Sequence, residues 1–124
     1  MWSYYGSKSK VVDFYPPPKY GKIIEPFAGS ARYSLKFFDR DVLLMDKFEY
    51  IARLWKWLQL CSEKDILGLP DLKVGEDIRN YKFDCEEAQM LMRFMIGGGL
   101  PAPQWIVSSY SHANNDKKRI AKNL

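Results

Sequence analysis

The sequence predicts an α/β fold, and three observations carry that prediction. Two short apolar runs, residues 22–26 and 41–45, have the length and composition of strands. A segment with helical character, residues 30–38, separates them, and a longer amphipathic helix is expected over residues 48–60. A strand, a helix and a second strand in this order are typical of a βαβ unit with parallel strands.

The flanking elements have local signals of their own. Residues 9–15 predict a short helix that ends at Pro16-Pro17-Pro18, because proline cannot continue a helix. In residues 48–60 apolar side chains recur at helical spacing, so this helix should bury one face against the sheet. The residues of that face are Ile51, Leu54, Trp55 and Leu58, and we expect Trp55 and Trp57 to serve core packing rather than base stacking.

The second half of the chain predicts mainly helix and loop. Between residues 62 and 83 the pattern weakens around Gly68, Pro70 and Gly75, which indicates loops with short helical pieces. Residues 84–96 predict a helix with Asp84 as its N-cap, ended by the glycines at 97–99. Its apolar face consists of Ala88, Leu91, Met92 and Met95. We therefore expect one compact domain with an α/β part over residues 1–60 and a helical second half over 61–124.

Composition limits the functions that this chain can have. Its 124 residues are 47% hydrophobic, enough for one buried core, and its formal charge of +4 suits a nucleic-acid partner without requiring one. No apolar run reaches the length of a membrane span, so no membrane partner is expected. Cys61 and Cys85 lack metal-ligand spacing, His112 stands alone, and we expect no metal and a cytoplasmic location.

The turn after the first predicted strand carries the functional signal. Ala28, Gly29, Ser30 and Ala31 are small enough to let the backbone approach a ligand closely. Asp46 follows the second strand, 17 positions after Gly29, near the offset at which an acid meets ribose hydroxyls. The loop lacks the glycines that a pyrophosphate requires, so a nucleoside cofactor without phosphates fits better. The pattern alone is equally compatible with a βαβ unit that binds nothing.

Three segments, in order, resemble the Dam-like group of adenine-N6 DNA methyltransferases. Tyr4-Tyr5-Gly6-Ser7-Lys8 resembles the aromatic-x-Gly-Gly-Lys motif that opens these enzymes, and Glu25-Pro26-Phe27-Ala28-Gly29-Ser30 resembles their Glu-Pro-Phe-x-Gly-x-Gly cofactor loop. Asp46 stands where their ribose-binding acid stands. The resemblance covers residues 1–60 closely and the rest only loosely.

The resemblance implies a partial Rossmann-like fold that binds S-adenosylmethionine. It further implies site-specific methylation of adenine in double-stranded DNA, as in restriction-modification systems. The cofactor-binding residues that it implies are Tyr4, Gly6, Lys8, Glu25, Pro26, Phe27, Ala28, Gly29, Ser30 and Asp46.

The chain also departs from the family pattern. Ala31 replaces the second glycine of the loop, and Ser7 replaces a glycine of the opening motif. The Asp/Asn-Pro-Pro-Tyr/Phe motif that holds the target adenine is absent, and the triple proline lies before the first strand. We therefore expect no catalytic residue in this chain and no activity from it alone. We expect either that the sequence is a fragment of a longer enzyme or that a second chain carries the motif. The open sheet edge would be covered by a partner or would favour self-association.

Two segments near the end of the chain are candidates for DNA contact. They contain hydroxyl groups and positive charges, namely Ser108, Ser109, Tyr110, Lys117, Lys118 and Arg119. A solvated helix face or a frayed terminus is the favoured explanation of the basic residues. Two other functions stay open: a catalytically silent module that binds DNA or protein, and, ranked below it, a nicotinamide-dependent oxidoreductase.

Overall fold

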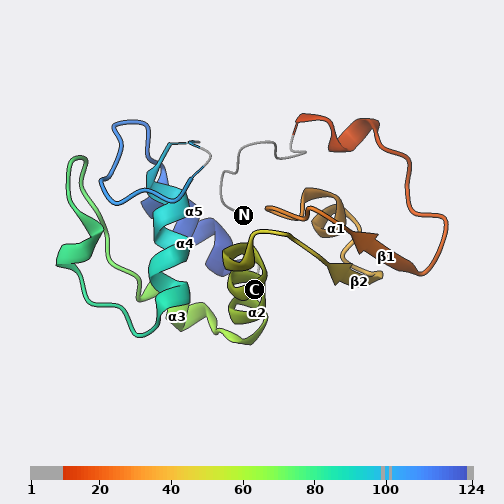
Figure 1. Ribbon diagram of the computed structural model, residues 1–124, viewed down its shortest axis with the longest axis horizontal. Helices are drawn as coiled ribbons and strands as arrows, with labels where there is room; N and C mark the ends of the chain where they lie inside the picture. The colour runs from red at the N-terminus through yellow and green to blue at the C-terminus, as the bar shows by residue number, and fades with distance from the viewer. Residues whose placement is uncertain (1–9, 99, 101, 123–124) are drawn as a thin grey trace.

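The computed structural model describes residues 10–98, 100 and 102–122. Within these residues it contains five α-helices and a two-stranded parallel sheet, which confirms the mixed α/β class. We call residues 10–48 the sheet part and residues 49–122 the helical part. Figure 1 shows the sheet part on one side of α2 (Glu49–Leu60), the first helix of the helical part, and the other helices of that part on its other side.

The two strands form where the apolar runs predicted them. The strands β1 (Lys22–Glu25) and β2 (Asp41–Leu44) pair in parallel, with Lys22 opposite Asp41 and Glu25 opposite Leu44. β-Branched Ile23 and its neighbour Ile24 favour the extended backbone of β1. Pro26 ends β1 because its nitrogen carries no hydrogen for a ladder bond.

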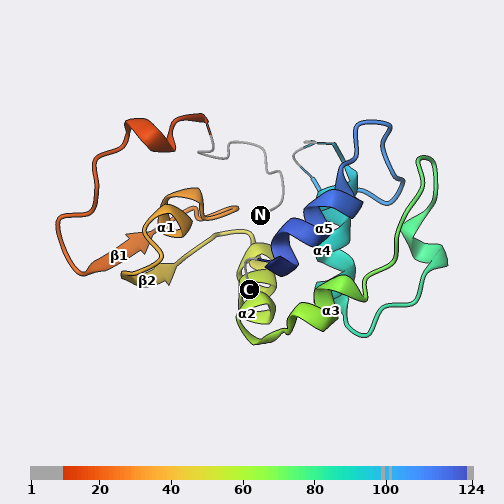
Figure 2. The same ribbon diagram turned by 180° about the vertical axis from the view of Figure 1, so that it is seen from behind.

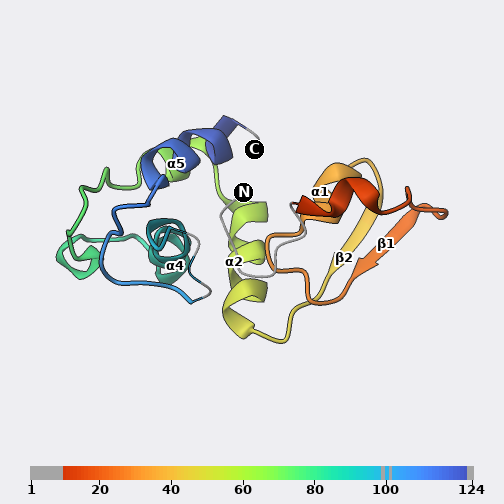
Figure 3. The same ribbon diagram turned by 90° about the horizontal axis from the view of Figure 1, so that it is seen from above.

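A short helix crosses from β1 to β2 and covers one face of the sheet. This helix, α1 (Arg32–Lys36), is shorter than the predicted 30–38. It starts late because the backbone of Ala31 is left-handed, with φ 49°, and it ends at Lys36 because Phe37 leaves the helical conformation. Ile23 is buried on the face beneath α1, whereas Ile24 and Leu43 on the other face are 58% and 45% exposed. Figure 3 shows α1 lying along the two strands. One face of the sheet is therefore open to solvent.

Four helices build the rest of the described chain. They are α2 (Glu49–Leu60), α3 (Glu63–Leu67), α4 (Glu86–Ile96) and α5 (Ala113–Lys122). Helix α2 packs against α4, and α3 packs against α5, as Figure 2 shows from behind. The most deeply buried large side chains of this part are Ile51, Leu54, Ile66, Ile78, Leu91, Met92, Ile96 and Ile120. The core therefore lies mainly in the helical part.

Helix α2 confirms the amphipathic pattern, since its four predicted face residues are buried. Trp55 is a core residue, and half-buried Trp57 packs against the core. Between α2 and α3 the chain turns at Ser62, whose side chain accepts a hydrogen bond from the Asp65 N–H while the Asp65 carboxylate accepts from the Ser62 N–H. This reciprocal capping fixes where α3 begins.

The prediction that Asp84 caps the next helix is wrong. Helix α4 has Cys85 as its N-cap residue, without a side-chain hydrogen bond to the backbone. The negative charge in the first turn comes from Glu86 and Glu87, both of which pair with Arg53 of α2. The predicted face of α4 is buried, together with Met90, Phe94 and Ile96.

Single turns of 3-10 helix occupy two other segments. Within the described residues, the predicted short helix at 9–15 contains the 3-10 turn η2 (Val12–Phe14). The turn η3 (Ile78–Asn80) is one of the short helical pieces that the sequence predicts between residues 62 and 83. The segment at 75–78 pairs with 105–107 through backbone bonds, including Ile78 N–H to the Trp105 carbonyl at 2.9 Å. The guanidinium carbon of Arg93 lies 3.6 Å from the Trp105 ring centroid, so the segment packs onto α4.

Gly98, after α4, has a conformation that other residues adopt at a cost. Its φ is 62°, and a Cβ added there would lie 2.8 Å from the Tyr110 Cβ. We expect Gly98→Ala to lower the free energy of unfolding by about 1–2 kcal/mol, because it combines a left-handed backbone with a close contact. Urea denaturation measures this. Gly21→Ala is the matched control, since nothing lies within 4 Å of its added Cβ, and equal losses in both variants would contradict the explanation.

Candidate functional site

The structure brings the small-residue loop and the acid of the second strand together. Both follow the carboxyl ends of neighbouring parallel strands, where α/β sheets commonly bind ligands. The Gly29 N–H donates to Oδ2 of Asp46 at 2.8 Å, and the Phe48 N–H donates to Oδ1 at 2.9 Å. Asp46 therefore ties the loop after β1 to the start of α2.

Two further hydrogen bonds hold the loop. The Ala28 N–H donates to the Met45 carbonyl at 2.8 Å, and the indole N–H of Trp55 donates to the Gly29 carbonyl at 2.8 Å. Ala28 and Ser30 are 4% and 1% exposed. The loop is thus fixed from both sides, by β2 and by α2, with its small side chains directed into the protein.

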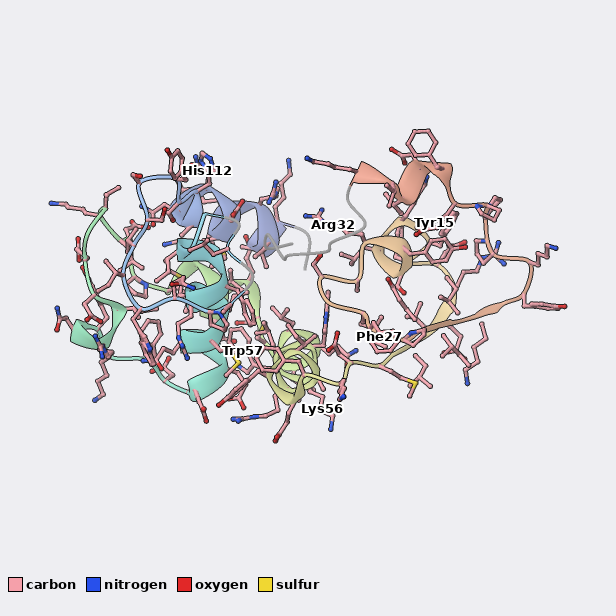
Figure 4. All side chains as sticks on the ribbon, turned by 45° about the horizontal axis from the view of Figure 1, so that its top comes forward. Tyr15, Phe27, Arg32, Lys56, Trp57 and His112 are labelled. Carbon is pink, nitrogen blue, oxygen red and sulfur yellow. The ribbon has the colours of Figure 1, made fainter. Side chains whose placement is uncertain are left out.

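The loop backbone is left-handed at three positions. Phe27, Gly29 and Ala31 have φ values of 55°, 51° and 49°. Such values cost little at glycine but roughly 1–2 kcal/mol at other residues. The Phe27 side chain is 74% exposed, and Figure 4 shows it between the strands and α2. An exposed aromatic ring on a fixed loop offers an apolar wall to a bound ring system.

Glu25 lies at the end of β1 and is 5% exposed. Its Oε2 accepts hydrogen bonds from the Ser34 N–H at 3.1 Å and from the Ser34 hydroxyl at 2.5 Å. These bonds hold α1 on the sheet. The neighbouring Pro26 is exposed.

Asp46 retains acceptor capacity beyond these contacts. Each carboxylate oxygen has two lone pairs, and each accepts one hydrogen bond from a backbone N–H group. The half-buried Asp46 also lines a cavity of about 310 Å³ between β2 and α2, together with Ala28, Trp55 and Lys56, the last of which Figure 4 labels. The carboxylate can therefore accept from hydroxyl groups of a ligand.

The remaining implied cofactor residues, Tyr4, Gly6 and Lys8, lie outside the described residues. The candidates for DNA contact occupy two places. Ser108, Ser109 and Tyr110 form a turn before α5 in which Tyr110 is 77% exposed. Lys118 and Arg119 lie on the exposed side of α5.

Lys117 differs from its two neighbours because it points into the protein. It is 4% exposed, and its Nζ donates to the Leu69 carbonyl at 2.8 Å and to Oδ1 of Asp71 at 2.6 Å. The ammonium group therefore joins α5 to the segment after α3. A phosphate contact from Lys117, which the sequence suggested, is not supported by this geometry.

Among the described residues, no group of three or more His, Cys, Asp or Glu side chains could hold a metal ion. Cys61 and Cys85 are free, and burial raises the pKa of the Cys61 thiol. In the same part of the chain, no helix combines the length and the apolar character that crossing a bilayer requires.

Sequence reasoning missed two residues near the loop. Helical spacing placed Trp55 in the core, but its bond to the Gly29 carbonyl could be anticipated only from the need of a buried indole N–H for an acceptor. Arg32, the first residue of α1, had no signal in the sequence, and Figure 4 shows it between α1 and α5.

Comparison with protein-family models found no matching family, and comparison with curated proteins and with solved structures found no match either.

The Trp55–Gly29 bond should contribute measurably to stability. Trp55→Phe keeps an aromatic ring but leaves the Gly29 carbonyl without this donor, so we expect a loss of about 1–3 kcal/mol in the free energy of unfolding. Trp57→Phe, at a half-buried position of the same helix, is the control for lost ring volume. Equal losses in urea denaturation would show that the hydrogen bond contributes nothing.

The Lys117–Asp71 pair predicts a pH dependence. The Lys117 ammonium group holds the pKa of Asp71 below its ordinary value. A lowered pKa in the folded state stabilises the protein above the unfolded pKa, and this contribution disappears as pH falls through the folded pKa. We expect Asp71→Asn to melt below wild type at pH 7 and the difference to shrink below about pH 4. The control is Asp39→Asn at an exposed position. A difference in melting temperature that stays constant with pH, or that Asp39→Asn reproduces, would contradict this explanation.

Proposed function

We propose that this chain is the S-adenosylmethionine-binding part of a DNA adenine-N6 methyltransferase with a partial Rossmann-like fold. The observation that carries the proposal is the bond between the Gly29 N–H and Asp46 at 2.8 Å. Two segments that resemble a cofactor loop and a ribose-binding acid lie against each other at the strand ends. A pocket for an adenosyl cofactor requires this arrangement.

The chemistry of the site favours an adenosyl ligand. Asp46 can accept from ribose hydroxyls, and the exposed Phe27 ring can wall a purine or the sulfonium end of the cofactor. The loop has few glycines and no Gly-Lys-Ser/Thr, so it serves a pyrophosphate or triphosphate poorly. A nucleoside that carries a methyl donor instead of phosphates fits these features best.

The methyl acceptor in this proposal is adenine in double-stranded DNA. The chain would hold the donor, and an Asp-Pro-Pro-Tyr segment, which these 124 residues do not contain, would orient the extruded base for attack on the methyl carbon. The chain by itself is then inactive.

Calorimetric titration with S-adenosylmethionine tests the cofactor site. We expect wild type to bind and Asp46→Asn to bind at least about tenfold more weakly, since a charged acceptor of ribose is lost. Asp41→Asn is the matched control, because Asp41 is exposed at the opposite end of β2. Folded wild type that shows no heat of binding, or equal affinities of the Asp46 and Asp41 variants, would refute the pocket.

The absence of the catalytic motif favours one alternative, a silent module that binds DNA or a protein without chemistry. A folded chain that binds DNA but not S-adenosylmethionine would select this alternative.

A further inference from the structure

Arg32 combines burial with a hydrogen-bond donor that nothing in the described chain satisfies. It is the first residue of α1 and is partly buried. Its Nε is buried and has no hydrogen-bond partner among the described residues. A buried N–H without an acceptor is costly, so native structures usually provide one from the chain, from water or from a ligand.

A second guanidinium group lies near Arg32. Burial lowers the pKa of Arg32, and the positive charge of Arg119 on α5 lowers it further. Ala31, which directly precedes α1, and Ile120 and Ala121 near the end of α5 all belong to the apolar core. Figure 4 shows Arg32 in the space between these two helices.

One carboxylate serves both guanidinium groups. Asp116 has a side chain that is 14% exposed, and its Oδ1 accepts from Nη2 of Arg119 at 2.7 Å. Its charge also acts on Arg32, but no hydrogen bond joins the two residues in the described structure. The cluster of Arg32, Asp116 and Arg119 thus contains two guanidinium groups, one carboxylate and the unsatisfied Nε of Arg32, which a bound anion would satisfy.

The surroundings identify the class of anion. Lys118 and Lys122 lie beside Arg119 on the exposed side of α5, so the positive surface continues from Arg32 along this helix. Arg119 itself is 56% exposed. A row of cations matches a chain of phosphates better than a single small anion. We propose that Arg32 and Arg119 together bind one backbone phosphate of nucleic acid, at the junction between α1 and α5.

This inference rests on the DNA partner of the proposed function but uses no residue of the cofactor pocket. The proposed phosphate site lies close to the candidate cofactor loop, because Arg32 directly follows the loop at 26–31. A phosphate bound there would bring the nucleic acid next to the loop that the proposed function assigns to the methyl donor.

The salt dependence of DNA binding tests the proposal. With a short labelled duplex in fluorescence anisotropy, each phosphate contact adds about 0.9 to the slope of log affinity against log salt. We expect Arg32→Gln to lower that slope by about 0.9 and to weaken binding roughly eightfold near 0.1 M salt. Arg32→Lys keeps the charge and should keep the slope. Arg119→Gln should lower the slope by the same amount. Because Arg119 is on the exposed surface, this variant tests the proposal if Arg32→Gln fails to fold.

Arg40 provides the matched control. Its Nε is also buried without a partner in the described chain, but it lies beyond the opposite end of α1, directly before β2. Arg40→Gln should leave the slope unchanged. An unchanged slope in folded Arg32→Gln, an equal change in Arg40→Gln, or wild type that binds no duplex overturns the inference. Calorimetric titration with S-adenosylmethionine tests the cofactor pocket separately. If the DNA experiment overturns the phosphate site, the proposed cofactor pocket therefore still stands.

Discussion

The carboxylate of Asp46 is the contact on which the sheet part depends. Its two oxygens hold the Gly29 N–H and the Phe48 N–H, so one side chain fixes both the turn after β1 and the entry into α2. The loop has a left-handed backbone at Phe27 and Ala31, at a cost of roughly 1–2 kcal/mol each. A charge-assisted bond contributes about 1.5–3 kcal/mol, and the bonds of Ala28 and Trp55 contribute about 0.5–1.5 kcal/mol each. These gains offset the strain, so the loop can keep its shape without a ligand.

The same contacts couple the two parts of the molecule. The core lies mainly in the helical part, and few residues of the sheet part are fully buried. Trp55 belongs to that core and also donates to the Gly29 carbonyl, while Ala31 reaches the core from the loop. The candidate site therefore sits where a thinly packed sheet is attached to a well-packed helical core. Its geometry depends on α2 as much as on the strands.

Periodicity explains which parts of the fold the sequence predicted. The strands, α2 and the buried face of α4 follow from apolar runs and helical spacing, which are local properties of the chain. The late start of α1 does not follow from such local properties. Ala31 adopts a left-handed backbone there, and only the surrounding hydrogen bonds impose it. The orientation of α5 was also hidden, since its buried stripe contains Lys117, whose ammonium group is satisfied by residues more than forty positions away. The order of the site residues was readable from motifs, but the bonds between them depend on tertiary contacts.

The open face of the sheet constrains how a larger assembly could form. Parallel sheets are normally covered on both faces, and here α1 covers only the side of Ile23 and Glu25. In the ladder between β1 and β2, the carbonyl groups of Gly21 and Glu25 accept hydrogen bonds from N–H groups at the two ends of β2. Because backbone groups alternate between the two edges of a strand, the N–H and C=O groups of Lys22 and Ile24 point to the free edge of β1. Pro26 then limits pairing along that edge, because it offers no N–H. An added strand would find only a short ladder along this edge, so the apolar side chains of Ile24 and Leu43 offer a binding partner more than the edge does.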